Sequence, residues 1–497
     1  MANPSLQIGN DNWAIKEDNL LGYSTAGTRF VPQPITMTRA TSGTRVNPQG
    51  LVETVELLGS EEITNGDFAT DLSGWDLQGT NATNTITWET NGARIISTGV
   101  NIGMAQTSVL TIGKTYKLTC DVNITLGKIG LDGATSGLTV NMVEGFNEII
   151  FTAISTTFKI KRITGNDNCL LDNVSVKEAT IDNLPRVDYT DGTSSLLVEP
   201  QRTNVFIQND ISTWNGFSSY ADETTAPDGT TIDFVNMEDR RIFPTTTISN
   251  STEYTSSIYL KGNKTANVKL RNTAANDTVI TLSTEWQRFE LTATSVSTIT
   301  NALLIDARYG QGMGAAGLEI AIYGGQVEQG SYPTSYIPTS GSTVTRNQDQ
   351  YSKTGISNLI NSEEGVLFLE MAALSDDLTN RVISLNDGTA TNRLMLYFNS
   401  LSNTIAVVIT SGGSTINYAV SDETSFNKMA VRYRDNDLTL WVDGQSRGTP
   451  ITSATIPTFT ALKFDSGGGS SPFYGKVKQL QVFKTALSDS ELATLTT

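Results

Sequence analysis

The sequence predicts an all-β protein made of several β-sandwich domains, and three observations support this class. Only 17% of the 497 residues are charged and 42 are glycine, a composition that suits sandwiches with many turns. Apolar and polar residues alternate over residues 115–124, and again on both sides of a turn within residues 428–443. Such alternation indicates strands buried on one face, the second pair forming a hairpin. A chain of this length exceeds a single core and predicts three or four domains.

Residues 1–60 form the first segment and contain too few apolar residues for a core of their own. Trp13, Leu20 and Phe30 are scattered among polar and turn-forming residues. Such a segment becomes ordered by packing on a partner or on a neighbouring domain. We therefore expect residues 1–60 to attach the chain to other components of an assembly. The alternative is that they supply one or two strands to the next domain.

Residues 61–180 and 205–348 are predicted to be two copies of one domain, separated by a connector at residues 181–204. Three positions recur at a nearly constant offset of about 140 residues: Trp75 and Trp214, Tyr116 and Tyr254, and Phe151 and Leu291. The glycine-rich residues 310–317 mark an insertion in the second copy. The shared position of Trp75 and Trp214 predicts that both pack in the core.

The opening NGDF…GW and the closing LDNVSV of the first copy resemble the galactose-binding-like jelly rolls that include many carbohydrate-binding modules. This resemblance implies a jelly roll in both copies. It also implies a structural calcium ion that ties the opening loop to the closing strand, held here by Asn65, Asp67 and Asp172. The second copy lacks the closing carboxylate, since residues 321–325 replace LLDN. No other cofactor is expected.

Residues 349–497 are predicted to form a different sandwich that ends in a short helix. Ser488 and Glu491 have the spacing of a capping box for that helix. The hairpin followed by the pattern G-K-V-x-x-L-x-V-F-x-x-A-L-S-x-x-E-L resembles the concanavalin-like, laminin-G-type lectin fold. Some laminin-G relatives bind a metal, for which the candidates here are Asp435, Asn436, Asp437 and Asp465. Turn formation alone explains the first three. The predicted fold is thus two galactose-binding-like jelly rolls plus one concanavalin/laminin-G-like sandwich.

Three joining segments, residues 36–50, 184–204 and 324–349, separate these parts. In the last of them Pro333, Pro338 and Gly341 prevent a regular element from continuing. Tyr332 and Tyr336 lie between these breakers, so we expect the segment to lie against a surface.

The joining segments contain TRATSGTRVNPQGLVE, SLLVEPQRTN and EQGSYPTSYIPTSGSTVTR, which resemble sequences common in bacteriophage virion proteins, where sandwich domains are strung along tail or fibre components. The resemblance implies a tail-fibre or receptor-binding component that attaches to host surface glycans. It also implies other virion proteins as partners of the N-terminal segment, and a homotrimer by analogy. Two alternatives stay open, a head fibre or capsid decoration protein and a polysaccharide depolymerase.

Exposed aromatic rings are the side chains expected to bind sugars, because a flat ring covers the apolar face of a pyranose. The candidates outside the two predicted core tryptophans are Trp88, Tyr220, Tyr309, Tyr418 and Tyr474. Core packing is the alternative for each of them.

The composition argues against several function classes. Histidine is absent, which removes the commonest general base and the usual zinc and iron ligands. Adjacent carboxylates such as Glu363 and Glu364 fall on predicted loops, and no E-x-D-x-x-E pattern of concanavalin-like glucanases occurs. We therefore expect a chain that is not an enzyme. The net charge of −17, without a basic block, argues against nucleic acid as a partner.

Cys120 and Cys169 fall on apolar strands of one domain and are predicted to be buried free thiols, with a disulfide as the alternative. The opening MANPSLQIGN has neither the basic region nor the apolar run of a secretory signal. No stretch approaches the roughly 18 apolar residues of a membrane span. These observations predict synthesis in the cytoplasm without membrane insertion, and the resemblance to phage virion proteins implies that the protein is made in the host and located in the virion.

Overall fold

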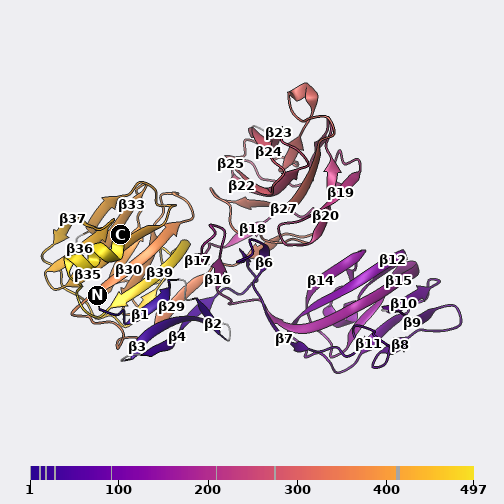
Figure 1. Cartoon of the computed structure of the whole chain (residues 1–497), viewed down its shortest axis with the longest axis horizontal. Helices are drawn as coiled ribbons and strands as arrows, with labels where there is room; N and C mark the ends of the chain where they lie inside the picture. The colour runs from indigo at the N-terminus through magenta and orange to yellow at the C-terminus, as the bar shows by residue number, and fades with distance from the viewer. Residues whose placement is uncertain are drawn as a thin grey trace. The chain divides into compact units, whose positions relative to one another are not determined.

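Almost every regular element of the protein is a β-strand (Figure 1). The computed structural model describes residues 2–10, 13–16, 19–26, 29–90, 92–208, 210–273, 276–409 and 415–497. The chain divides into two compact units, unit 1 with Met1–Val55 and Asp182–Thr497, and unit 2 with Glu56–Ile181. No helix in the described ranges is long and apolar enough to cross a membrane. The predicted all-β class is confirmed.

Unit 2 is a jelly roll organised around two long strands. β12 (Thr115–Leu131) and β15 (Phe158–Thr180) pair antiparallel along most of their length, with several register shifts that bend the pair. The other elements of unit 2 are β7 (Leu57–Glu61), β8 (Asp76–Gln78), β9 (Thr85–Glu89), β10 (Gly92–Ser97), β11 (Gly103–Gln106), α1 (Gly133–Ser136), β13 (Val140–Asn141) and β14 (Gly145–Thr152). β10, β11 and β7 pair with β15, whereas β13 and β14 pair with β12.

The alternation predicted for residues 115–124 is confirmed, because every second side chain in the first half of β12 enters the core of unit 2. Both cysteines are free and buried, as predicted. Burial raises the pKa of Cys120 to about 12 and that of Cys169 to about 11, so both thiols stay protonated at neutral pH. They therefore act as small apolar core residues.

The second jelly roll, in unit 1, has two separate antiparallel sheets facing each other across one core. The first consists of β19 (Tyr220–Thr225), β20 (Thr231–Asn236), β27 (Glu319–Gln329), β22 (Glu253–Gly262) and β25 (Gln287–Thr294). The second consists of β21 (Arg241–Ile242), β26 (Leu304–Asp306), β23 (Ala266–Thr273) and β24 (Asn276–Leu282). Two 3₁₀ turns, η1 (Ile211–Thr213) and η2 (Tyr309–Gln311), lie in its loops, and η2 overlaps the start of the predicted insertion.

The two jelly rolls hold their opening loops with the same contact. Trp75 is 7% exposed, and its indole Nε1 donates to the carbonyl oxygen of Asn65 at 3.0 Å. Trp214 is 4% exposed, and its Nε1 donates to the carbonyl oxygen of Gln208 at 3.0 Å. A buried indole N–H needs such an acceptor. The core role predicted for both tryptophans is therefore confirmed.

A tyrosine hydrogen bond also recurs in both copies. The hydroxyl of Tyr116 accepts from the backbone N–H of Thr111 at 2.8 Å. The hydroxyl of Tyr254 accepts from the backbone N–H of Ser249 at 3.4 Å. In each copy the donor precedes the tyrosine by five residues, at the start of the domain's main strand. The repeat inferred from the sequence thus has the same local structure in both copies.

The last part of unit 1 is a two-layered antiparallel sandwich with one large core. One layer contains β30 (Glu364–Ala373), β35 (Asn427–Arg434), β36 (Asp437–Val442), β37 (Gln445–Ile451) and β39 (Gly475–Phe483). The other contains β29 (Gln350–Thr354), β31 (Arg381–Asn386), β32 (Arg393–Phe398), β33 (Thr404–Ile409), β34 (Thr415–Ala419) and β38 (Ala461–Lys463). The predicted hairpin is β35–β36, and the capping box of α2 (Asp489–Thr496) is present as predicted.

The N-terminal segment differs from the expected attachment arm, because its strands complete this last sandwich. They are β1 (Leu6–Gly9), β2 (Ala14–Lys16), β3 (Asn19–Ala26) and β4 (Arg29–Thr38). β1 pairs with β39, and β4 pairs with β29. Leu6, Ile8 and Ile35 are fully buried in the core of the sandwich. A few apolar residues are enough to order these strands, because each strand covers only one edge of the core. Most of that core consists of residues after position 350.

The three joining segments converge in unit 1. They contribute strands to two small sheets, β5–β6 (Thr44–Val46 and Val52–Thr54) and β18–β28 (Arg202–Asn204 and Val344–Arg346), of which β6 follows the first segment directly. They also form β16 (Arg186–Asp188) and β17 (Ser195–Val198), and β17 pairs with β39. Tyr332 is only 6% exposed, which confirms that the last segment lies against a surface.

Five charged side chains from these segments form what we call the arginine–carboxylate cluster: Arg39, Arg186, Glu199, Arg346 and Asp349. Arg186 bridges the two acids, contacting Glu199 at 2.5 Å through Nη1 and Asp349 through Nη2. Arg39 Nη1 lies 2.8 Å from Asp349 Oδ1, and Arg346 Nη1 lies 2.6 Å from Glu199 Oε2. All five side chains are at most 3% exposed. The cluster thus ties together segments distant in sequence.

The cluster keeps the buried side chain of Glu199 ionised. Burial opposes its charge, but the charges of Arg346 and Arg186 and two hydrogen bonds from Ser335 outweigh burial and hold the pKa of Glu199 well below its ordinary value. Removing one partner from such a buried network leaves an uncompensated charge, which costs about 3–5 kcal/mol. The joint between the segments is therefore sensitive to each of its members.

Replacing Arg186 by Met should lower the free energy of unfolding of unit 1 by about 3–5 kcal/mol, because Glu199 and Asp349 lose their shared cation. Urea denaturation of the full chain measures this. The control is Arg271→Met, which removes a more exposed pair with Asp277 and should cost only about 1 kcal/mol or less. Equal losses in the two variants would contradict a structural role for the cluster.

Lowering the pH should destabilise the fold of unit 1, because Glu199 becomes protonated. Because its folded-state pKa is lowered, its contribution to stability is complete above about pH 4.5 and is lost as the pH falls below that value. We expect the melting temperature of unit 1 to fall below pH 4.5, and to fall less steeply in Glu199→Gln, which starts from lower stability at pH 7. Calorimetric scans between pH 3 and 7 test this, and parallel curves for the two proteins would refute it.

Candidate functional site

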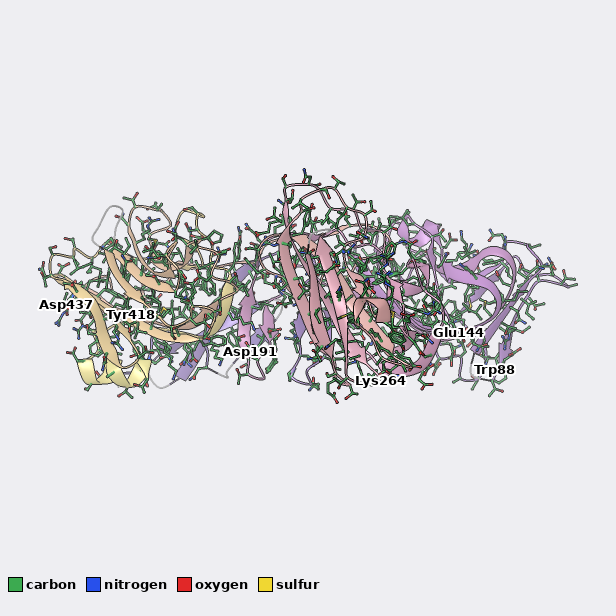
Figure 2. All side chains as sticks on the ribbon, turned by 90° about the horizontal axis from the view of Figure 1, so that it is seen from above. Trp88, Glu144, Asp191, Lys264, Tyr418 and Asp437 are labelled. Atoms are coloured by element: carbon green, nitrogen blue, oxygen red, sulfur yellow. The ribbon has the colours of Figure 1, made fainter. Side chains whose placement is uncertain are left out.

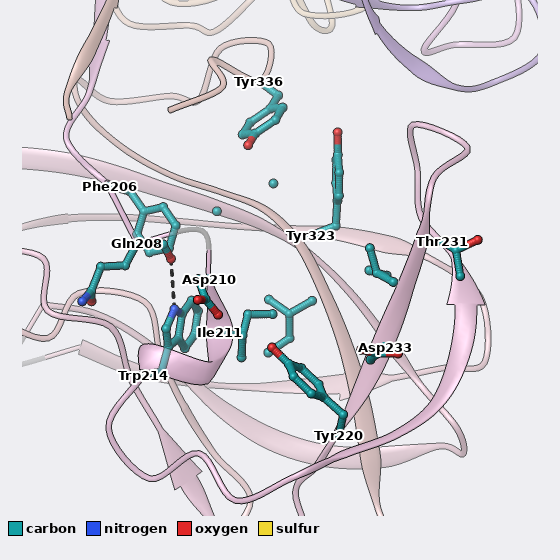
Figure 3. Close-up of a pocket in the computed structure, with 14 residues that line it drawn as sticks. Phe206, Gln208, Asp210, Ile211, Trp214, Tyr220, Thr231, Asp233, Tyr323 and Tyr336 are labelled. Carbon is teal, nitrogen blue, oxygen red and sulfur yellow. Dashed lines mark hydrogen bonds between the residues drawn. The ribbon is translucent and has the colours of Figure 1, made fainter. Parts of the chain in front are cut away.

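The second jelly roll contains a pocket of about 360 Å³ (Figure 3). Its walls come from the opening loop with η1, the β19–β20 hairpin, the middle of β27 and the last joining segment. The lining residues are Phe206, Gln208, Asp210, Ile211, Trp214, Tyr220, Thr231, Ile232, Asp233, Ile322, Tyr323, Gly324, Gly325 and Tyr336. A volume of this size suits a small ligand or one part of a larger chain.

Two glycines of β27 create room at the pocket floor. A Cβ at Gly325 would lie 2.7 Å from the Phe206 ring, and Gly324 adopts a positive φ of 62°. Phe206 can therefore lie close to the strand backbone, where it packs edge-on against Trp214 with ring centroids 5.8 Å apart. The hydrogen bond from Trp214 to Gln208, drawn in Figure 3, holds the opening loop at this edge of the pocket.

Three tyrosines from different elements surround the pocket in Figure 3. Tyr220 is 46% exposed, and its ring packs against Phe217 with centroids 4.9 Å apart. Tyr323 and Tyr336 pack together at 5.6 Å. Burial raises the pKa of all three hydroxyls, so they stay protonated at neutral pH and remain hydrogen-bond donors.

Polar side chains complete the lining. Asp210 and Asp233 provide carboxylate acceptors. The side chain of Asp210 also accepts from the backbone N–H of Ser212 at 3.0 Å, which fixes the loop at η1. Rings that cover an apolar face, next to acceptors for hydroxyl groups, form the kind of surface that a sugar contacts.

Of the predicted aromatic candidates, Tyr220 alone lines this pocket. Trp88 is 42% exposed on unit 2 (Figure 2), and its Nε1 donates to the carbonyl oxygen of Phe68 at 2.6 Å. Tyr309 is 44% exposed at η2, and its hydroxyl donates to Glu238 Oε1 at 3.1 Å. Their role in ligand binding stays a prediction.

The two candidates in the last sandwich are partly covered by arginines. Tyr418 is labelled in Figure 2. The guanidinium of Arg447 lies 4.9 Å from its ring centroid. That of Arg381 lies 5.5 Å from the ring centroid of Tyr474, whose hydroxyl donates to Gln348 Oε1 at 2.6 Å. These cation–π contacts occupy one face of each ring, and a ligand would have to use what remains exposed.

Most of the pocket residues carry no signal in the sequence that would mark them as a binding site. Tyr323 and Asp233 lie on strands whose alternation indicates only burial, and Tyr336 was expected to anchor a connector.

The proposed calcium ligands of unit 2 lie near one another without forming a recognisable metal cluster. The Asn65 amide donates to the carbonyl oxygens of Asp71 and Ser73, each at 3.0 Å. Burial raises the pKa of Asp172, and the charges of Asp121 and Asp67 raise it further. No group of three His, Cys, Asp or Glu side chains in the described parts of the chain is placed to hold a metal ion. Calcium at Asn65, Asp67 and Asp172 therefore stays a prediction.

The acidic residues of the last sandwich make turn and ion-pair contacts. Asn436 has a positive φ of 60°, as turn formation requires, and Asp437 pairs with Arg434 at 2.8 Å. Asp435 Oδ1 accepts from the backbone N–H of Ile456 at 3.2 Å. Asp465 accepts from the backbone N–H of Gly467 at 2.5 Å, which shapes the glycine-rich loop. The turn interpretation of these residues is thus supported.

Comparison with known families agrees with the fold of the last sandwich. Residues 368–493 match the family model described as the concanavalin A-like lectin/glucanases superfamily. The match covers the part of the chain for which the sequence predicted a laminin-G-type lectin fold. No protein with a curated description matches the chain.

The solved structures that match the chain include proteins of several kinds. The N-terminal CBM22-1-CBM22-2 tandem domain of Paenibacillus barcinonensis Xyn10C matches with 9% identity and a TM-score of 0.18, covering 55% of this chain and 98% of that one. A Trypanosoma rangeli sialidase matches with 10% identity and a TM-score of 0.25, covering 95% of each chain. These values are too low to carry a functional argument.

The expectation that the chain is not an enzyme needs correction. Sialidases, which are enzymes, are among the structures that it matches along nearly its whole length. At 9–10% identity and TM-scores of 0.23–0.25 these matches do not support an enzyme assignment either. We therefore assign the chain neither an enzymatic activity nor the lack of one.

Proposed function

We propose that the protein binds glycans through the pocket of the second jelly roll. The observation that carries this proposal is the combination, in one pocket, of Tyr220, Tyr323 and Tyr336 with the carboxylates of Asp210 and Asp233. The rings offer flat apolar faces, whereas the carboxylates and tyrosine hydroxyls can exchange hydrogen bonds with sugar hydroxyls. The lectin-like fold of the last sandwich is consistent with a second contribution to binding.

Binding at one such pocket is expected to be weak, because it is small and open to solvent. Several copies acting together would raise the apparent affinity through effective concentration, by as much as about 10²–10⁴. A homotrimer, as the resemblance to virion fibres implies, would supply three equivalent pockets. Light scattering of the purified chain would measure its oligomeric state.

Tyr220→Ala should reduce glycan binding at least about tenfold, since it removes the most exposed ring of the pocket. Titration of the full chain with ligands from a glycan array measures this loss. Tyr309→Ala is the matched control, because Tyr309 is equally exposed on the same jelly roll but lies outside the pocket lining.

Unchanged affinity in Tyr220→Ala would refute the assignment to this pocket. If Tyr309→Ala alone abolished binding, the site would lie at η2. Near-ultraviolet circular dichroism of both variants shows whether the jelly roll stays folded.

We further propose that the protein is a virion component, a tail-fibre or receptor-binding part that carries glycan-binding domains to the host surface. Support comes from the joining sequences, which resemble those of phage virion proteins, and from the lectin-like sandwich. A head fibre or decoration protein would use the same joining sequences and is the second candidate.

Immunogold labelling of intact phage particles with antibody against residues 350–497 is expected to mark the tail end. Labelling spread over the capsid would exclude a tail fibre and favour the head-fibre alternative. A particle without any label would remove the virion proposal while leaving glycan binding to be judged by the titration.

A further inference from the structure

Two acidic side chains meet at one end of the last sandwich, away from the pocket described above. Asp376 lies in the loop between β30 and β31, and Glu423 in the loop between β34 and β35. The loop between β32 and β33 lies against both. Its Ser402 hydroxyl donates to Asp376 Oδ2, and its Asn403 side-chain oxygen accepts from the backbone N–H of Glu423 at 2.9 Å. Three loops are therefore brought together around this acidic pair.

Each of the two acids has a buried oxygen without a partner. Glu423 is only 1% exposed, and its Oε2 has no hydrogen-bond partner among the described residues. The same holds for Oδ1 of Asp376. A buried carboxylate oxygen left unpaired costs free energy, and two such groups close together repel each other as well. Burial and the charge of Asp376 accordingly raise the pKa of Glu423 to about 7.

The cation whose charge acts on Glu423, that of Arg381, also makes other contacts. Arg381 donates to Asp377 Oδ2 at 2.5 Å, and its guanidinium lies over the ring of Tyr474. Its charge lowers the pKa of Glu423 but does not offset burial and the charges of Asp376 and Asp377. A proton on Glu423 would remove the charge of that side chain, and Asp376 Oδ1 could then be paired only by accepting a hydrogen bond from this proton. A bound cation would neutralise both acids at once.

We propose that Asp376 and Glu423 bind a divalent cation of the Ca²⁺ type, which links the three loops at this end of the last sandwich. Ca²⁺ accepts an irregular set of oxygen ligands, including carboxylates, hydroxyls, amides, backbone carbonyls and water. Ser402 and Asn403 are the neighbouring side chains that can add oxygen ligands. The proposed site has two carboxylates. It therefore differs from a cluster of three or more His, Cys, Asp or Glu side chains, and no such cluster is placed to hold a metal ion in the described residues.

Calorimetric titration of the EGTA-treated full chain with CaCl₂ at pH 8 tests this. With only two carboxylates, the dissociation constant is expected on the order of 10⁻⁴–10⁻³ M. Glu423→Gln and Asp376→Asn should each weaken this binding at least about tenfold, and the exposed control Glu363→Gln should leave it unchanged. Wild-type binding should weaken below pH 7, because protonation of Glu423 competes with the cation.

Hydrogen exchange of the wild-type chain locates the ion without relying on the variants. Ca²⁺ is expected to slow exchange in residues 374–380, 399–403 and 420–426. Binding that is equally strong in Glu423→Gln and Asp376→Asn, or protection confined to unit 2, would overturn the proposal. So would a wild-type chain that binds no Ca²⁺ up to about 10 mM, ten times the weakest expected constant. In that case a proton shared by the two acids would explain their unpaired oxygens.

Discussion

The architecture of unit 1 depends on the arginine–carboxylate cluster at the meeting point of the joining segments. Arg186 lies between Glu199 and Asp349, and each acid accepts from a second arginine. An ion network buried this deeply gains little net stability over an apolar core, but its geometry is specific, because each charge must find its own partner. We interpret the cluster as the device that fixes how the segments meet. Gly- and Pro-rich connectors, which would otherwise sample many conformations, are thereby held in one.

The two jelly rolls show how a repeated domain can keep its fold while changing its surface. The indole hydrogen bonds of Trp75 and Trp214 close the opening loop in the same way in both copies. In the second copy, glycines of β27 and the adjoining joining segment, with Tyr336, create a pocket next to the contact that both copies share. The core contacts thus specify the fold, whereas the surroundings of the loop determine what can bind there.

Two buried glutamates of unit 1 have pKa values that are shifted in opposite directions. In the arginine–carboxylate cluster, Glu199 is fully paired, and its pKa is lowered. At the end of the last sandwich Glu423 is equally buried but keeps an unpaired oxygen, and its pKa is raised to about 7. The difference arises from the neighbours, two arginines in one case and another carboxylate in the other. In the first arrangement the acid is neutralised by cations of the chain itself, whereas in the second Glu423 and Asp376 each keep an unpaired oxygen.

The sequence by itself determined the local features of this protein. Alternation in residues 115–124 gave a strand, the residues around Asp435 gave a hairpin, and Trp75 and Trp214 revealed a repeat, because each depends on neighbours in sequence or on a recurring pattern. Only the tertiary structure decided which distant residues meet. Arg39 and Asp349 are 310 positions apart, and β1 pairs with β39 near the other end of the chain. No local periodicity encodes such pairings, since they arise when many apolar strands are buried together and the few charged groups among them must find partners.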